Sequence, residues 1–172
     1  IEPIYIPVKT DVKMNDPDYS VQWHYHNTGQ GSGRKGIDMK LQEAWDQYGM
    51  FGNSNVIVAI LDSGVDYDHP DLAGNIWTNE VELNGKAGVD DDGNGYRDDV
   101  HGYNFVAGSA EIHPEDHGTH VAGTVGAVNN NGVGVCGVAG GRYPEKGVRL
   151  MCLQIMDATL PDKGASLAKV MQ

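Results

Sequence analysis

The sequence is poor in cysteine and in basic residues, and it lacks a long apolar segment. Two cysteines, Cys136 and Cys152, allow at most one disulfide, which excludes a disulfide-based fold; both stand in apolar runs, which predicts buried free thiols. Lysine and arginine number 12 against 24 acidic residues, and the net charge of -12 argues against nucleic-acid binding. No apolar run approaches the roughly 18 residues of a membrane-spanning helix, so we expect no membrane span in this chain.

Acidic residues and glycine are abundant instead. The stretch from residue 62 to residue 116 holds 14 acidic residues and only two basic ones, Lys86 and Arg97, so the negative charge is concentrated there. Such a concentration of carboxylates favours cation binding. The 24 glycines in 172 residues are about twice the usual ~7% and predict many tight turns. The chain is long enough for one domain with a buried core.

The order of the apolar segments predicts a layered α/β domain. Residues 56–61 are apolar at every position, which is typical of a strand covered on both faces, and residues 149–156 predict a second buried strand. Between them, residues 117–128 form a helical segment rich in glycine and alanine, so its backbone must lie close to another element. A further helix is expected to begin near Ala165. Strand, helix, strand and helix in this order favour a parallel sheet.

The segment before this α/β unit is less regular. Residues 1–15 combine β-branched residues with prolines and predict an arm or an edge strand. Residues 38–50 carry apolar side chains at helical spacing and predict an amphipathic helix, with Asp38 as its N-cap and Gly52 just beyond its end. The three tryptophans are expected to anchor the core; they are Trp23, Trp45 and Trp77.

Two residues at the ends of predicted elements have the chemistry of an acid–base pair. Asp62 directly follows the first strand, and active sites collect at the carboxyl ends of parallel strands. His117 begins the glycine-rich helix, where the helix dipole disfavours the imidazolium ion and keeps the ring able to accept a proton. An aspartate that orients a histidine supplies two thirds of a nucleophilic triad.

Three motifs surround these two residues. They read Asp62-Ser63-Gly64-Val65-Asp66, His69-Pro70-Asp71-Leu72 and His117-Gly118-Thr119-His120-Val121-Ala122-Gly123-Thr124-Val125. These motifs closely resemble the amino-terminal signatures of the subtilisin family of serine peptidases, and those of its thermitase-like members in particular. The resemblance implies a three-layer α/β fold around a mostly parallel, twisted sheet, in which Asp62 holds the imidazole and His117 is the general base. It further implies the amino-terminal half of a peptidase domain at residues 15–172; the predicted arm, residues 1–14, lies outside the resemblance.

The nucleophile of that family is not found in these 172 residues. In the family, a serine follows the histidine in a Gly-Thr-Ser-Met-Ala motif; the segment around Ser166 imitates this motif but stands only 49 residues after His117. We therefore expect the isolated chain to be inactive, and its partners to be a protein or peptide substrate and the remaining half of the catalytic domain. The sheet of a half domain would expose an apolar flank, which favours self-association. The resemblance also implies an extracellular or cell-surface location.

The acidic run at residues 90–99 matches part of a calcium-binding loop, because oxygen ligands alternate around a glycine turn. The candidate ligands, at template positions 1, 3, 5, 7 and 9, are Asp90, Asp92, Asn94, the carbonyl of Tyr96, and Asp98. The twelfth position departs from the template, since it holds His101 in place of a bidentate glutamate. The alternative is a solvated acidic turn, but five carboxylates in ten residues repel one another without a counterion.

A second calcium site is implied by the resemblance alone. In thermitase-like subtilases, a calcium ion ties the amino-terminal arm to the loop after the active-site helix. The matching ligands here are Asp16, Asp71, the side chain of Asn131, and the carbonyls of Val128, Val133 and Val135. Such an ion would stabilise the folded state by mass action, so calcium is expected to be structural rather than catalytic.

Three other interpretations remain open at the level of sequence. An Asp-Ser-Gly turn after a strand also occurs in aspartic peptidases, which are all-β proteins. A zinc site could use Asp116, His117, His120 and His113, although no His-Glu-x-x-His pattern is present. A calcium-stabilised pseudopeptidase or binding domain would keep the scaffold without turnover. A Gly-Thr-Ser-Met-Ala motif encoded downstream of Gln172 would distinguish a peptidase from this last alternative.

Overall fold

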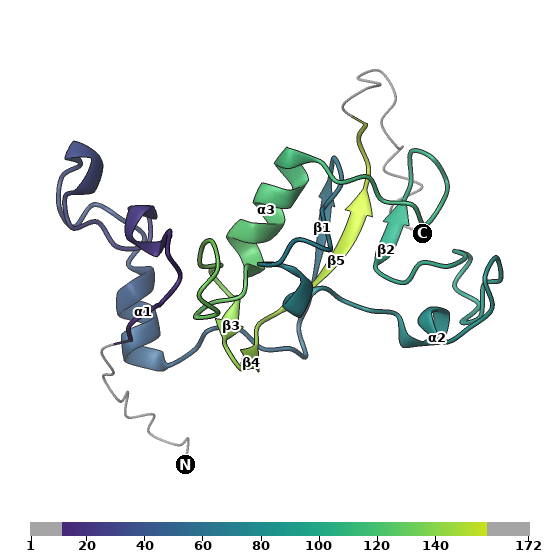
Figure 1. Cartoon of the computed structure of the whole chain (residues 1–172), viewed down its shortest axis with the longest axis horizontal. Helices are drawn as coiled ribbons and strands as arrows, with labels where there is room; N and C mark the ends of the chain where they lie inside the picture. The colour runs from purple at the N-terminus through teal and green to yellow at the C-terminus, as the bar shows by residue number, and fades with distance from the viewer. Residues whose placement is uncertain (1–11, 158–172) are drawn as a thin grey trace, which may run out of the picture.

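A three-stranded parallel sheet lies at the centre of residues 12–157, the part of the chain that the computed structural model describes, with the strand order β1–β5–β2 (Figure 1). In chain order the helices and strands are α1 (Leu41–Tyr48), β1 (Ile57–Asp62), α2 (Glu80–Leu83), β2 (Gly102–Asn104), α3 (Asp116–Gly126), β3 (Gly141–Arg142), β4 (Glu145–Lys146) and β5 (Arg149–Gln154). Short 3-10 helices lie at Tyr19–Val21, Gln30–Ser32 and Ala73–Asn75. The predicted order of strand, helix and strand is confirmed.

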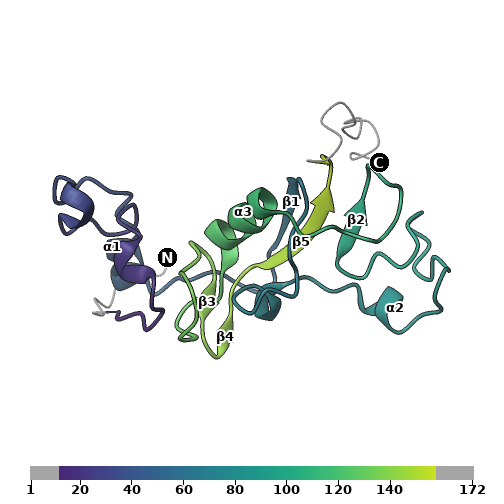
Figure 2. The same cartoon turned by 45° about the horizontal axis from the view of Figure 1, so that its top comes forward.

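Helix α3 covers one face of this sheet, across β1 and β5 (Figure 2). In the register of the two strands, Ile60 lies beside Cys152, and both side chains are buried in the core with Ala122 of α3. A Cβ atom on Gly126 would lie 3.1 Å from a methyl carbon of Leu150. The small residues of α3 therefore let the helix backbone approach the sheet closely, as the sequence predicts.

The opposite face of the sheet is open. Along β1, exposed and covered side chains alternate, and both Ile57 and Leu61 are 42% exposed. On β5, Met151, which is in register with Ala59, and Leu153, which is in register with Leu61, are only half-buried. The prediction that β1 is covered on both faces is therefore wrong for the described residues. A run that is apolar at every position shows that both faces can be buried, but it does not identify the element that covers the second face. We call Ile57, Ala59, Leu61, Met151 and Leu153 the open face.

A second, smaller core joins the amino-terminal segment to the loop after α3. Tyr25, Trp45 and Cys136 are fully buried there, and the indole nitrogen of Trp45 donates a hydrogen bond to the carbonyl of Val138 (3.3 Å). Trp45 is thus a core anchor, as predicted. Trp23 is not, because its side chain is 52% exposed while Tyr25 occupies the core position.

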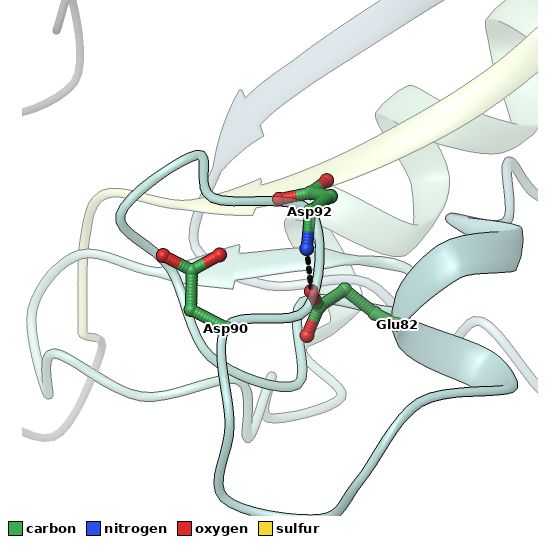
Figure 3. Close-up of side chains that lie close together, drawn as sticks. All are labelled: Glu82, Asp90 and Asp92. Atoms are coloured by element: carbon green, nitrogen blue, oxygen red, sulfur yellow. Dashed lines mark hydrogen bonds between the residues drawn. The ribbon is translucent and has the colours of Figure 1, made fainter.

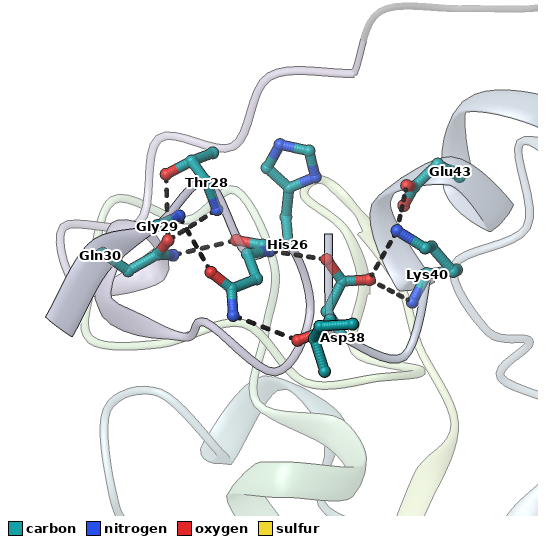
Figure 4. Close-up of polar contacts among 9 residues, drawn as sticks. His26, Thr28, Gly29, Gln30, Asp38, Lys40 and Glu43 are labelled. Carbon is teal, nitrogen blue, oxygen red and sulfur yellow. Dashed lines mark hydrogen bonds and ion pairs between the residues drawn. The ribbon is translucent and has the colours of Figure 1, made fainter. Parts of the chain in front are cut away.

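Helix α1 is confirmed, but its predicted ends are wrong. The carboxylate of Asp38 does not cap the helix; it accepts hydrogen bonds from the backbone N–H groups of Asn27 (2.8 Å) and Lys40 (2.9 Å) (Figure 4). The Asp38 carboxylate therefore links the loop at Asn27 to Lys40, the residue before α1. The helix ends at Tyr48, and Gly49, which has a left-handed φ of 62°, caps it three residues before the predicted Gly52.

Both cysteines are buried and free, as predicted. Burial raises the pKa of the Cys152 thiol to about 12, so this thiol stays protonated at neutral pH. Within residues 12–157, no helix is long and apolar enough to cross a membrane. The helix expected from Ala165, Ser166 and most of the predicted arm lie outside the described residues.

Candidate active site

The carboxyl end of β1 and the amino-terminal end of α3 meet at two glycines. Gly64 follows β1 with a positive φ of 128°, and a Cβ atom there would lie 2.0 Å from the carbonyl oxygen of His113. Gly118, in the first turn of α3, packs directly on the backbone of Gly64. The glycines of the two motifs therefore allow a close backbone approach that brings Asp62 and His117 together.

The two predicted catalytic residues are in direct contact. Nδ1 of His117 lies 2.6 Å from Oδ1 of Asp62, across 55 residues of sequence. The same carboxylate oxygen accepts hydrogen bonds from the backbone N–H (2.7 Å) and the hydroxyl (3.1 Å) of Ser63. The side chain of Asp62 is 10% exposed, whereas that of His117 is 74% exposed. A buried carboxylate thus orients an imidazole ring whose remaining surface is open.

The environment of Asp62 favours its ionised form. Burial acts to raise the pKa of this carboxyl, but the hydrogen bonds from His117 and from Ser63 outweigh burial, and the net pKa lies below its ordinary value. With a carboxylate as its acceptor, Nδ1 of His117 carries the proton in the neutral ring, and Nε2 is left with a free lone pair. This arrangement can take a proton from a nucleophile placed at Nε2.

The acidic loop forms a compact carboxylate cluster whose composition differs from the prediction. Among residues 12–157, one group of acidic residues offers oxygens that all lie within 4.8 Å of one another: Glu82, Asp90 and Asp92 (Figure 3). Glu82 belongs to α2 and is buried; its carboxylate accepts hydrogen bonds from the backbone N–H groups of Asp91 (2.7 Å) and Asp92 (3.1 Å). Sequence reasoning missed Glu82 because it lies eight residues before the loop and reaches it only through the fold.

Asp98 and Asn94, two further ligands predicted in this loop, are not among the three residues of the cluster. The carboxylate of Asp98 accepts hydrogen bonds from the backbone N–H of Gly88 (2.9 Å) and is not a member of the cluster. The side-chain amide of Asn94 donates to Asp92 (3.1 Å) and to Asp99 (3.0 Å), so Asn94 remains beside the cluster. Burial raises the pKa of the Asp99 carboxyl, and the nearby negative charges of Asp92 and Glu82 raise it further. The cluster fits a hard cation, which prefers several carboxylate oxygens around a turn.

The residues predicted for the second cation site come together from distant parts of the chain. Asp16 accepts hydrogen bonds from the backbone N–H groups of Asn130 (2.7 Å) and Asn131 (3.1 Å). Asp71 accepts hydrogen bonds from the side chain of Asn131 (2.8 Å) and the backbone N–H of Val135 (2.9 Å). The backbone N–H of Val128 donates to the carbonyl of Asp71 (2.8 Å).

Both carboxylates of this second group are buried. Burial, followed by the negative charge of Asp16, raises the pKa of the Asp71 carboxyl. None of the ion pairs within residues 12–157 joins a lysine or arginine to Asp16 or Asp71. Two buried carboxylates that share one loop are chemically suited to a divalent cation, which would offset their repulsion.

The structure does not favour the competing enzymatic interpretations. The parallel sheet with a packed helix differs from the all-β fold of aspartic peptidases. His113, Asp116, His117 and His120 form no group with metal-ligand spacing in the part of the chain that the structure describes. A zinc site at the start of α3 is therefore not supported.

Comparison with known proteins gives a consistent result. A model of the "Subtilase family" matches residues 53–143, a range that contains both Asp62 and His117. Subtilisin-like protease 1 of Plasmodium vivax is 43% identical over 130 residues, which cover 74% of this chain and 19% of that protein. Neuroendocrine convertase 2 of Homo sapiens is 38% identical over 150 residues, which cover 82% of this chain and 19% of that protein.

Solved structures show the same similarity in three dimensions. The serine protease of Aeromonas sobria, solved in complex with its chaperone, matches with a TM-score of 0.61 and 26% sequence identity over 92% of this chain and 23% of that chain. The same protease solved without the chaperone gives a TM-score of 0.56 at 27% identity, over 91% of this chain and 23% of that one. The chain spans about a fifth of the length of the relatives it matches. The predicted subtilisin-like α/β fold is confirmed, and the chain belongs to the subtilase family.

Proposed function

We propose that Asp62 and His117 are the acid–base pair of a serine endopeptidase with an Asp-His-Ser triad. The observation that carries this proposal is the 2.6 Å contact between Asp62 Oδ1 and His117 Nδ1, at the carboxyl end of β1. The same order of aspartate before histidine occurs in subtilisin. The substrate of such an enzyme is a protein or a peptide.

In this proposal, His117 is the general base and later the general acid. Its Nε2 takes the proton of the attacking serine hydroxyl, and the carboxylate of Asp62 stabilises the imidazolium ion that results. His117 then delivers the proton to the leaving amine of the cleaved peptide bond. The low pKa of Asp62 supports this role, because the carboxylate must stay ionised while the imidazole is charged.

We propose further that the 172-residue chain alone does not hydrolyse peptides. No serine in the sequence stands in a Gly-Thr-Ser-Met-Ala motif. Ser63, the serine next to the pair, uses its hydroxyl as a donor to Asp62, on the Nδ1 side of the imidazole. The nucleophile must therefore come from the remaining half of a catalytic domain, which is the partner that we propose for this chain.

We propose structural calcium ions at two places. The first ion would bind at Glu82, Asp90 and Asp92, with Asn94 beside them, and the second between Asp16 and Asp71. The grouping of carboxylate oxygens in the first case supports the proposal. In the second case, two buried carboxylates that share one loop support it. A requirement for calcium fits an extracellular or cell-surface location, where calcium is abundant, and we propose that location.

Complementation tests the proposed function. The purified chain is assayed on a denatured protein, alone and after refolding with a polypeptide that carries the serine-containing half of a related subtilase. We expect no hydrolysis from the chain alone and measurable hydrolysis from the mixture. His117→Ala should abolish the hydrolysis by the mixture, because removal of the catalytic histidine of subtilisin costs about 10⁶-fold in turnover.

Two results would overturn the proposal. Hydrolysis by the chain alone would show that the nucleophile lies within the 172 residues. A mixture that is as active with His117→Ala as without it would show that His117 is not the base. If the gene encodes no serine motif downstream of Gln172, a binding domain without turnover replaces the peptidase.

A further inference from the structure

Three buried polar side chains end the three strands of the sheet. Asp62 ends β1, Gln154 ends β5 and Asn104 ends β2. In the strand register, Gln154 is paired with Asp62 on one side and with Asn104 on the other, so the three side chains lie in a row on the face that α3 covers. Gln154 is 1% exposed and Asn104 is 2% exposed. Buried amides of this kind are costly unless each is fully hydrogen-bonded.

Each of these three side chains forms a hydrogen bond with a different residue between Glu111 and His117, the candidate base. The side-chain amide of Asn104 donates to the carbonyl of Glu111 (3.0 Å). Oε1 of Gln154 accepts a hydrogen bond from the backbone N–H of His113 (2.9 Å). Oδ1 of Asp62 contacts Nδ1 of His117 (2.6 Å). The three side chains thus form hydrogen bonds, in chain order, with residues 111, 113 and 117.

The segment before α3 has no regular secondary structure, although its Ile112 is buried in the core. Residues 111–115 belong to no helix or strand, so no backbone ladder fixes them before α3 begins at Asp116. The other end of the Gln154 side chain donates to the carbonyl of Met156 (3.2 Å), which prevents the amide from rotating. The carbon of the same amide group lies 3.4 Å from the place where Gly64 would carry a Cβ atom. The Gln154 side chain therefore packs between the turn after β1 and the segment before α3.

We propose that Gln154, supported by Asn104, is a positioning residue that fixes the start of α3 and so the imidazole of His117 relative to Asp62. The hydrogen bonds of the Gln154 side chain go to the backbone of His113 and Met156, so Gln154 acts on the imidazole through the His113 backbone. This inference rests on the proposed function, because it gives a role to the distance between the two members of the acid–base pair. If the acceptor is lost, the N–H of His113 is left unsatisfied and the segment shifts to reach water.

The test compares two buried side-chain amides, those of Gln154 and Asn75, whose hydrogen bonds lie at opposite ends of α3. Gln154→Met removes both hydrogen bonds at nearly constant volume. Asn75→Leu is the matched control, because Asn75 is also 1% exposed and makes three hydrogen bonds, but to Gly126, Gly140 and Gly147 at the other end of α3. The readouts are the thermal midpoint of each variant and the NMR resonance of the His117 Nδ1 proton, which a short hydrogen bond to a carboxylate moves downfield.

We expect both variants to lower the thermal midpoint, but only Gln154→Met to move the His117 proton resonance upfield or abolish it. Equal His117 resonances in the two variants would overturn the inference. If Asp62→Asn also leaves the resonance unchanged, the proposed acid–base pair fails as well; if Asp62→Asn moves the resonance, only the role of Gln154 fails.

Hydrogen exchange in the unmodified chain gives an independent test that does not depend on the folding of a variant. We expect the amide of His113 to exchange as slowly as the amides of β5, because its acceptor is a buried side chain. Exchange of the His113 amide at the rate of an unprotected loop would overturn the inference.

Discussion

Gly118 of α3 lies against Gly64 so closely that a Cβ atom on Gly118 would be 2.0 Å from the Gly64 carbonyl oxygen. No real Cβ contact is that short, and the obstacle is backbone rather than a flexible side chain. The contact sets how near the start of α3 comes to the end of β1. It is therefore the steric condition for the hydrogen bond between His117 and Asp62.

A methyl group at position 118 tests this condition. Gly118→Ala must push α3 away from the turn after β1. We expect this to lower the free energy of unfolding by at least roughly 1–3 kcal/mol. Gly123→Ala is the matched control in the same helix, because a Cβ atom there meets no atom within 4 Å. The control should be neutral or more stable by up to about 1 kcal/mol. Urea unfolding of both variants checks the expectation, and equal stabilities would contradict it.

Much of the site follows from the sequence, and the parts that do not have identifiable causes. Apolar runs predicted β1 and β5, the segment rich in glycine and alanine predicted α3, and the motifs around Asp62 and His117 predicted their proximity. The role of Glu82 was not predictable from spacing, because α2 brings this residue to the acidic loop through tertiary structure. The sequence pattern also does not show that the carboxylate of Asp98 accepts a hydrogen bond from the N–H of Gly88, a residue ten positions earlier, outside the cluster of Glu82, Asp90 and Asp92.

The low pKa of Asp62 predicts a dependence of stability on pH. Because the folded-state pKa lies below that of the unfolded chain, about 3.9, the unfolded state binds more protons as the pH falls. The stabilisation by this carboxylate is therefore present above the unfolded pKa and is lost as the pH falls through the folded pKa. We expect Asp62→Asn to lower the free energy of unfolding at pH 7 by roughly 1.5–3 kcal/mol, the range for hydrogen bonds to charged groups.

Urea unfolding at several pH values measures this effect. The difference between the unmodified chain and Asp62→Asn should shrink below about pH 4, as the carboxylate of the unmodified chain becomes protonated. A difference that stays constant down to low pH would show that the substitution acts through packing rather than through charge.

The proposed calcium ions predict a response to chelation. For calcium at about 100 times its dissociation constant, one site adds roughly 2.7 kcal/mol, and we expect EDTA to lower the thermal midpoint by about 5 °C or more. Asp90→Asn and Asp16→Asn should each reduce the rise in midpoint that calcium causes, one for each site. Asp68→Asn, an exposed acidic residue outside both groups, is the control and should leave the rise unchanged. A midpoint that does not respond to calcium in the unmodified chain would contradict both sites.

The open face of the sheet predicts self-association of the isolated chain. Its apolar side chains are exposed on one contiguous strand pair, and such patches favour contact with another apolar surface. We expect Ile57→Lys to shift the chain toward the monomer in sedimentation experiments at rising concentration. Val81→Lys changes a side chain on α2, away from the sheet, that is 50% exposed, and it should have no effect. A chain that is already monomeric at high concentration would contradict this prediction.

The ring nitrogens of His117 test the central claim most directly. Nitrogen NMR of the labelled chain distinguishes a ring nitrogen that carries a proton from one with a free lone pair. With the ring neutral, we predict a proton on Nδ1, a free lone pair on Nε2, and a change in both signals when Asp62 becomes Asn. A proton on Nε2, or signals that Asp62→Asn leaves unchanged, would contradict the assignment of His117 as a base oriented by Asp62.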